Sequence, residues 1–422
     1  MPFRFVHTAD IHLDSPLRSL AMRNPELAGL IAGATRDALT AIVDLCLEER
    51  VDALIVAGDL YDGDQTSMKT ARFLAGQMER LHHGGIAAYK VRGNHDALSK
   101  ITQELILPPS LKLFGGRAEA VEIDAGGISV AIHGLSFSRP HAPESLLPKY
   151  SRPRPGAVNI GIMHTSLQGA PGHDPYAPCA VADLQGWGFD YWALGHIHLR
   201  SALAGAATVV MPGMPQGRNI GEAGPKSVTL VTIGDDHSIR IEERVTSIAQ
   251  FETVTTDLSG AASWPEAVDR VERAVAEVRA SAAAPHLVAR LRLEGATSLA
   301  WRLRHEHELL VTEIEHRMAG AGGIWIDKVE IAAQPSRTEA SAGEVDPMVE
   351  LGALIGGEMR AEPAIRQAVE ALVKELRDDL PPDAREVFGR DEAAFEAFLD
   401  KLIGDSGEEI VARLAESGAE PR

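Results

Sequence analysis

The stretch Gly93-Asn94-His95-Asp96 places three polar side chains directly after a run of apolar residues. The preceding residues 86–91 (Ile-Ala-Ala-Tyr-Lys-Val) are typical of a buried β-strand. A glycine at the end of such a strand permits a sharp turn. The amide, imidazole and carboxylate that follow it are groups that bind metals or phosphates. Alone, this tetrapeptide is a weak indication of a functional site.

Four other stretches of the chain repeat this design, in which metal-binding side chains follow an apolar run that predicts a strand. These side chains are Asp10 and His12 after residues 3–6, Asp59 and Asp62 after residues 53–56, His164 after residues 158–163, and His196 and His198 after residues 189–194. In open α/β sheets, functional residues gather where strands end and loops begin. The five strand ends are therefore expected to meet at one point.

The expected ligands are two carboxylates, one amide and four imidazoles: Asp10, His12, Asp59, Asn94, His164, His196 and His198. This set is too large for one tetrahedral ion and favours two ions that share a carboxylate. Metal pairs about 3.5–4 Å apart serve in-line attack on phosphoryl centres. Mixed nitrogen and oxygen ligation favours Mn²⁺, Fe or Zn over Mg²⁺. A single histidine at a strand end is more often an ordinary loop residue, so the prediction depends on all five stretches together.

In this order, the motifs D-x-H, G-D-x-x-D, G-N-H-D, an isolated H and G-H-x-H resemble the calcineurin-like metallophosphoesterases. The resemblance implies a first metal held by Asp10, His12, Asp59 and His198. It implies a second metal held by Asp59, Asn94, His164 and His196. His95 matches the family's non-ligand histidine, which contacts the phosphate and assists the leaving group. Asp96 is expected to orient His95, as carboxylates behind an active site do.

Length and composition limit the organisation of the chain. Its 422 residues are too many for one compact core, so two or three domains are expected. The net charge is −19, and residues 338–422 carry 21 acidic and 9 basic side chains. No basic stripe stands out, which argues mildly against tight stand-alone DNA binding. Two isolated cysteines, Cys46 and Cys179, and the lack of a long apolar run favour a cytoplasmic protein without a membrane segment.

The predicted fold class is α/β: a calcineurin-like metallophosphoesterase sandwich of two β-sheets flanked by helices, with a small α+β capping domain and a helical C-terminal tail. The predicted domains are residues 1–248 (metallophosphoesterase or nuclease), 249–333 (β-α-β-α-β capping domain) and 346–422 (acidic helical region, possible partner docking). Residues 124–127 are expected to form the turn of a hairpin. By resemblance, the strands predicted at 208–211, 228–233 and 239–245 are expected to close the second sheet.

Two longer stretches, residues 7–16 (His-Thr-Ala-Asp-Ile-His-Leu-Asp-Ser-Pro) and residues 164–179, look like the YhaO branch of the SbcD-like DNA repair exonucleases. The resemblance implies a metal-dependent DNA exonuclease or phosphodiesterase that uses hydroxide activated by two metals, with Mn²⁺ expected and Fe or Zn as alternatives. It also implies that the middle module sorts DNA substrates and that the tail binds an SMC-like ATPase of the SbcC/YhaN type. A homodimer is a further expected partner state. Asp62 stands where archaeal and eukaryotic relatives carry a histidine, which leaves its catalytic part open.

Two other functions fit the same residues. The first is a phosphatase or cyclic-nucleotide diesterase with small substrates, and the second is a regulatory subunit of an ATPase. Two residues are candidates for substrate binding. His173 either touches substrate or fixes its loop, and Arg218 could approach a phosphate. The basic, proline-rich residues 139–156 are more typical of a solvated loop than of a phosphate-contacting rim.

Overall fold

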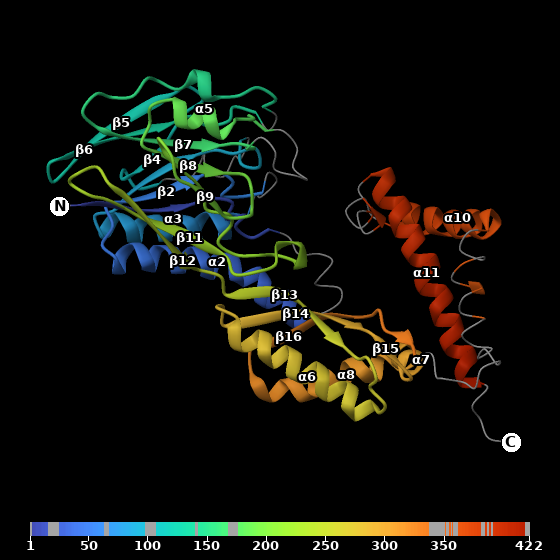
Figure 1. The fold of residues 1–422 in the computed structure, drawn as a ribbon. Helices are drawn as coiled ribbons and strands as arrows, with labels where there is room; N and C mark the ends of the chain where they lie inside the picture. The colour runs from blue at the N-terminus through green and yellow to red at the C-terminus, as the bar shows by residue number, and fades with distance from the viewer. Residues whose placement is uncertain are drawn as a thin grey trace. The chain divides into compact units, whose positions relative to one another are not determined.

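The computed structural model describes residues 2–15, 25–62, 67–97, 107–139, 142–167, 176–336, 351, 354–355, 357, 362–380, 385, 388–389 and 391–417 (Figure 1). The chain divides into two compact units. The first comprises residues 1–252 with 282–288, and the second comprises residues 253–281 with 289–422.

The first unit is built on a six-stranded sheet in the order β12-β11-β1-β2-β3-β4. Its strands are β1 (Phe3–Thr8), β2 (Ala53–Ala57), β3 (Ala87–Val91), β4 (Leu111–Leu113), β11 (Ser227–Ile233) and β12 (Ile239–Val245). The four strands β1 to β4 run parallel, whereas β11 and β12 are antiparallel to their neighbours. The strands β1, β2 and β3 therefore end at the same edge of the sheet, as the sequence predicts.

A second six-stranded sheet has the order β5-β6-β7-β8-β10-β9. Its strands are β5 (Glu119–Ala125), β6 (Ile128–Gly134), β7 (Val158–His164), β8 (Tyr191–Gly195), β9 (Ser201–Leu203) and β10 (Thr208–Met211). The hairpin expected at residues 124–127 is confirmed, because β5 and β6 pair antiparallel on either side of it. β7 and β8 are parallel and central, so both end at one edge of this sheet.

The apolar strands bury both of their faces, which explains why they read as continuous hydrophobic runs rather than alternating ones. On one face of the first sheet, Val6 and Leu54 pack against the helices α2 (Pro25–Glu48) and α3 (Met68–His83) through residues such as Leu39. On the other face, Phe5 and Ile55 pack against the second sheet. The helix α5 (Val181–Gly186) covers the outer face of the second sheet (Figure 1). The two-sheet sandwich flanked by helices is thereby confirmed.

Of the three strands expected to close the second sheet, two lie in the first sheet instead, so the prediction is wrong for these two. β10 belongs to the second sheet, but β11 and β12 join the first sheet, where β11 pairs with β1 from Phe3↔Ile233 to His7↔Thr229. The reason lies in β1, which would otherwise be an edge strand with unpaired backbone groups beside a fully buried core. The 3₁₀ turns η1 (Leu147–Lys149) and η2 (Ile220–Glu222) lie in the connections of this unit.

His7 lies between the two sheets and is completely buried. Its Nε2–H donates to the carbonyl of Leu194, and its Nδ1 accepts from the hydroxyl of Tyr191, both at 3.0 Å. Burial lowers the pKa of His7 from 6.5 to about 3, so the folded protein holds this ring neutral. In the unfolded chain, the ring of His7 binds a proton below about pH 6.5. The stability that the neutral His7 contributes to the folded protein is therefore present above that pH and is lost as the pH falls.

We expect His7→Gln to remove this pH dependence. Between pH 7 and pH 5, wild-type unfolding free energy should fall by about 2 kcal/mol more than that of the variant, since one pKa unit corresponds to about 1.4 kcal/mol. Urea unfolding in the presence of EDTA, monitored at both pH values, measures this difference. Parallel pH curves for the two proteins would contradict the assignment of a neutral buried His7.

The second unit contains a three-stranded sheet in the order β13-β14-β16 and a short pair, β15-β17. Its elements are β13 (Ala249–Asp257), α6 (Trp264–Ser281), β14 (His286–Glu294), β15 (Ala296–Thr297), α7 (Ala300–His305), α8 (His307–Met318), η3 (Ala319–Ala321), β16 (Ile324–Ile331) and β17 (Gln334–Pro335). The first residues of β13 and β14 fall in the first unit. The β-α-β-α-β order expected for the middle of the chain is present.

The helical C-terminal region is confirmed by α10 (Pro363–Asp379) and α11 (Glu392–Ser417). Their hairpin has a small core around Val373, Phe395 and Leu399. None of the helices in the described ranges combines the length and the hydrophobicity that a bilayer-spanning helix requires.

Candidate metal centre

The loops that follow β1 and β2 run side by side beyond the end of the first sheet. The backbone N–H groups of Asp10, His12 and Leu13 donate to the carbonyls of Gly58, Asp59 and Leu60, respectively, at 2.9–3.2 Å. The second sheet reaches the same place, because the Nδ1–H of His164 donates to the carbonyl of Ala57 at 2.9 Å. The carboxylate of Asp10 accepts the backbone N–H of His196 at 2.9 Å. Strand ends from both sheets therefore meet at one point.

The backbone at this point is strained. Four of the predicted ligands have positive backbone φ angles, which residues other than glycine rarely adopt. They are Asp10 (52°), His12 (46°), Asp59 (49°) and His196 (107°). Such conformations cost roughly 1–3 kcal/mol each and are retained where a site requires them. Their concentration on the predicted ligands indicates that the fold positions these side chains at the expense of local stability.

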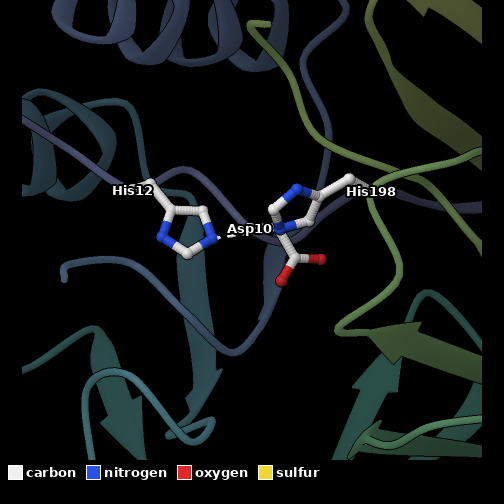
Figure 2. A group of neighbouring side chains, drawn as sticks. All are labelled: Asp10, His12 and His198. Carbon is white, nitrogen blue, oxygen red and sulfur yellow. Dashed lines mark hydrogen bonds between the residues drawn. The ribbon is translucent and has the colours of Figure 1, made fainter. Parts of the chain in front are cut away.

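The first group of side chains comprises Asp10, His12 and His198, whose ligand atoms lie within 4.8 Å of one another (Figure 2). The Nε2 atoms of His12 and His198 approach to 3.2 Å. In each ring, the other nitrogen faces a carboxylate: Nδ1 of His12 lies 2.6 Å from Asp62, and Nδ1 of His198 lies 2.9 Å from Glu222. The two Nε2 atoms share a hydrogen bond in this structure, and with Nδ1 bonded to a carboxylate in both rings, both Nε2 atoms would be available to a shared cation.

The second group comprises Asp59, His164 and His196, all of them buried. Nε2 of His164 lies 2.9 Å from the amide oxygen of Asn94 and 3.2 Å from a carboxylate oxygen of Asp59. The other carboxylate oxygen of Asp59 accepts the backbone N–H of His95 at 3.0 Å. The structure therefore brings together the seven residues that the sequence predicts as ligands. Nitrogen and oxygen donors of this kind suit a transition metal or zinc.

The electrostatics of the site also fit bound cations. Burial alone would raise the pKa of Asp59, but the neighbouring His164 outweighs it and holds this pKa well below the usual range. Burial alone would lower the pKa of His164, but Asp59 raises it to about 9. Burial raises the pKa of Asp10. Buried carboxylates of this kind require positive charge beside them, from a protonated histidine or from a metal ion.

His95 is the most exposed histidine of the cluster, with 47% of its side chain accessible. Its Nδ1 lies 3.3 Å from the carboxylate of Asp62, which also bonds His12. The hydrogen bond with Asp62 raises the pKa of His95. His12, Asp62 and His95 form a third group, in which the possible metal-ligand atoms lie within 4.8 Å of one another.

The role expected of Asp96 needs correction. Asp96 is completely buried, and its carboxylate accepts from Lys90 Nζ at 2.5 Å and from the backbone N–H of Gly93 at 2.7 Å and of Leu60 at 3.3 Å. These bonds fix the turn that carries Asn94, whereas the carboxylate beside His95 belongs to Asp62. The resemblance suggested Asp96, but its carboxylate bonds Lys90 and the backbone of its own turn instead.

Of the two predicted substrate-binding residues, His173 lies outside the described residues. Arg218 lies beside the first group, where it bonds Glu222 at 2.8 Å and Ser15 at 3.3 Å. Sequence reasoning missed Glu222 and the contact between His12 and Asp62. The pair Glu222 and His198 is separated by 24 residues without regular spacing, so no local signal could have identified it.

The space around Gly93 is too small for any side chain. A Cβ built on Gly93 would lie 2.7 Å from Cε1 and Nε2 of His164 and even closer to Oδ1 of Asp59. We expect Gly93→Ala to displace one of these two side chains and to weaken metal binding by more than about 10-fold. Calorimetric titration of the metal-free protein with Mn²⁺ measures the change.

Gly76→Ala is the matched control for this variant. Gly76 lies within α3 with open space around its missing Cβ, and alanine is favoured over glycine in helices by about 0.5–1 kcal/mol. The control should bind Mn²⁺ like the wild type and unfold at a slightly higher temperature. Wild-type affinity in Gly93→Ala would show that the site tolerates a methyl group there.

Comparison with known proteins agrees with this geometry. Residues 3–200 match the model of the family described as calcineurin-like phosphoesterase, and residues 251–334 match that of "Metallophosphoesterase YhaO, middle domain". The chain is 35% identical to "Uncharacterized metallophosphoesterase YhaO" of Bacillus subtilis over 54% of its length and 57% of that protein.

More distant relatives are archaeal proteins named "DNA double-strand break repair protein Mre11". The chain is 26% identical to that of Sulfurisphaera tokodaii over 50% of its own length and 54% of the relative. It is 25% identical to that of Methanocaldococcus jannaschii over 64% of its own length and 73% of the relative. The chain thus spans little more than half of the length of the first two relatives. Residues 3–200 thus match the calcineurin-like phosphoesterase family, and residues 251–334 match the YhaO middle-domain family.

Proposed function

We propose that this protein is a metal-dependent phosphodiesterase that acts on DNA as an exonuclease. The observation that carries the proposal is the convergence of two groups of potential metal ligands, one around His12 and one around His164, beside the accessible His95. The family of the domain supports hydrolysis of phosphoesters. The similarity to archaeal DNA repair proteins supports DNA as the substrate and DNA repair as the setting.

The donor set fits two divalent ions, for which we propose Mn²⁺, with Fe or Zn as alternatives. Asp10, His12, Asp59 and His198 would hold one ion, and Asp59, Asn94, His164 and His196 the other. When bound, such ions lower the pKa of water and neutralise charge on phosphate oxygens.

The chain's own residues supply a proton and a defined position for the substrate. Asp62 holds a proton on Nδ1 of His95 and raises the pKa of this ring, so that His95 is protonated over a wider pH range. Because 47% of the His95 side chain is accessible, a phosphodiester can reach this ring. We assign His95 the transfer of a proton to the departing sugar oxygen. Arg218, at the same rim, is proposed to attract phosphate.

An SMC-like ATPase of the SbcC/YhaN type is proposed as the protein partner of the C-terminal helices. The helices α10 and α11 expose large apolar side chains, of which Leu372 and Leu376 are accessible by 66% and 55%. Such side chains at i and i+4 form an apolar strip of the kind that binds a partner helix. A homodimer is a further proposal. The two buried, free cysteines fit the reducing conditions of a cytoplasmic location.

Cleavage of end-labelled single- and double-stranded DNA in the presence of Mn²⁺ tests the proposal. Products that shorten progressively from one end, and that disappear with Asp59→Asn, would support the exonuclease. Hydrolysis of bis-p-nitrophenyl phosphate without cleavage of DNA, both alone and with the ATPase partner, would contradict DNA as the substrate. That result would favour small phosphodiesters as the substrates.

A further inference from the structure

The segment that connects β10 to β11 contributes an acidic side chain to the candidate metal centre. η2 places Glu222 against the first group, where its Oε1 accepts the Nδ1–H of His198 at 2.9 Å. The side chain of Glu222 is only 12% accessible. The turn itself is fixed by Asn219, whose amide oxygen accepts the backbone N–H of Gly221 at 2.8 Å. Glu222 is therefore a preformed part of the site.

Arg218 holds this carboxylate from the other side. Its backbone N–H donates to Oε2 of Glu222 at 2.8 Å, and its Nη2 donates to Oε1 at 2.8 Å. Its Nη1 lies 3.3 Å from the hydroxyl of Ser15 and 3.9 Å from the carboxylate of Asp62. The guanidinium thus lies between the two carboxylates that bond the Nδ1 atoms of His198 and His12.

The arrangement has a chemical consequence for His198. Free imidazole exchanges its proton between two nitrogens, and a ring can bind a metal only through a nitrogen without a proton. A carboxylate at Nδ1 keeps the proton there and leaves the lone pair on Nε2, which faces His12 at 3.2 Å. Carboxylates behind ligand histidines commonly fix the tautomer and the orientation of the ring in this way.

We infer that Glu222, held by Arg218, is a positioning residue that fixes His198 as the Nδ1–H tautomer and directs its Nε2 to the first metal. This inference rests on the proposed metal-dependent function. Arg218 acts through Glu222 and Asp62, so one cation orients two carboxylates, and each carboxylate orients one histidine. Loss of Glu222 should leave the second group, around His164, unchanged.

The tautomer of His198 is the first test, and it requires no metal. The full chain is labelled with ¹⁵N-histidine, freed of metal with EDTA, and recorded by long-range ¹H–¹⁵N NMR, with His198→Gln to assign the signal. The wild type should show a protonated Nδ1. Glu222→Ala should move the proton to Nε2 in a large fraction of molecules. Glu222→Gln keeps an oxygen acceptor and should restore the wild-type tautomer.

Metal affinity is the second test. In calorimetric titrations with Mn²⁺, Glu222→Ala should weaken one of the two binding events by about 10- to 100-fold, and Glu222→Gln should recover most of the loss. Glu122→Ala is the matched control, because Glu122 pairs with Arg154 at 3.0 Å on the exposed surface. This control should bind Mn²⁺ like the wild type.

The outcomes separate this inference from the proposed function. A wild-type His198 without a proton on Nδ1, or wild-type Mn²⁺ affinity in Glu222→Ala, would overturn the role of Glu222. The tautomers could be as expected while the wild type binds no Mn²⁺. This result would support the positioning of His198 and would contradict the metal-dependent function. A purely structural role of Glu222 would lower thermal stability without changing the tautomer, and it too would overturn the inference.

Discussion

Asp59→Asn is expected to abolish phosphodiester hydrolysis while leaving the first unit folded. Asp59 is the carboxylate that reaches both His164 and the backbone of His95. Asparagine keeps one oxygen for the N–H of His95 but loses the negative charge that raises the pKa of His164. Removing an outer partner of a metal ligand typically costs about 10- to 100-fold, and loss of a shared ligand should cost more.

The backbone supports the choice of asparagine over alanine for this experiment. Asp59 has a φ of 49°, a conformation that asparagine adopts more readily than alanine. Thermal unfolding in EDTA should therefore occur near the wild-type temperature. Hydrolysis of bis-p-nitrophenyl phosphate and Mn²⁺ titration together measure the loss of function.

Asp52→Asn is the matched control, because Asp52 lies directly before β2 and Asp59 lies just after it. The carboxylate of Asp52 accepts the backbone N–H of Arg4 at 2.8 Å, at the opposite end of the strand from the site. The control should retain wild-type hydrolysis. Substantial hydrolysis by Asp59→Asn, with both Mn²⁺ ions bound, would show that Asp59 is not a shared ligand.

The site could be predicted to this extent because its signals are local. Each predicted ligand follows an apolar run, and a parallel sheet brings the ends of its strands together whatever the details of packing. The order of the five motifs then indicated a likeness to the calcineurin-like phosphoesterases, whose family model matches residues 3–200. Asp10 and His198 are 188 positions apart, yet both could be placed at the site because each follows a strand of predictable type.

The contacts between loops could not be predicted in the same way. Asp62, rather than Asp96, lies beside His95 because the loop after β2 folds over the turn after β3. Glu222 reaches His198 through an irregular connection whose course depends on tertiary packing. The positions of β11 and β12 depend on which sheet offers an open edge, and hydrophobic periodicity is the same for either sheet. Local patterns therefore predicted which side chains meet at the site but not the residues that orient them.

His95→Gln is expected to reduce cleavage of DNA by about 10²- to 10⁴-fold while both Mn²⁺ ions remain bound. His95 faces Asp62 through Nδ1, and nearly half of its side chain is accessible to substrate. Glutamine preserves polarity and approximate size but cannot transfer a proton at neutral pH. Single-turnover cleavage of end-labelled DNA measures the chemical step, and Mn²⁺ titration measures the metals. His83→Gln, on the exposed last turn of α3, is the control and should cleave normally.

The leaving group distinguishes proton transfer from other roles of His95. An alkoxide leaving from DNA requires a proton, whereas p-nitrophenolate is stable without one. His95→Gln should therefore slow DNA cleavage far more than hydrolysis of bis-p-nitrophenyl phosphate. Equal losses for both substrates would contradict proton transfer and favour binding of the phosphate. Loss of a metal ion would instead make His95 a ligand, as the proximity of His12, Asp62 and His95 allows. The ratio of the two rates, combined with metal content, therefore assigns His95 to one of these three roles.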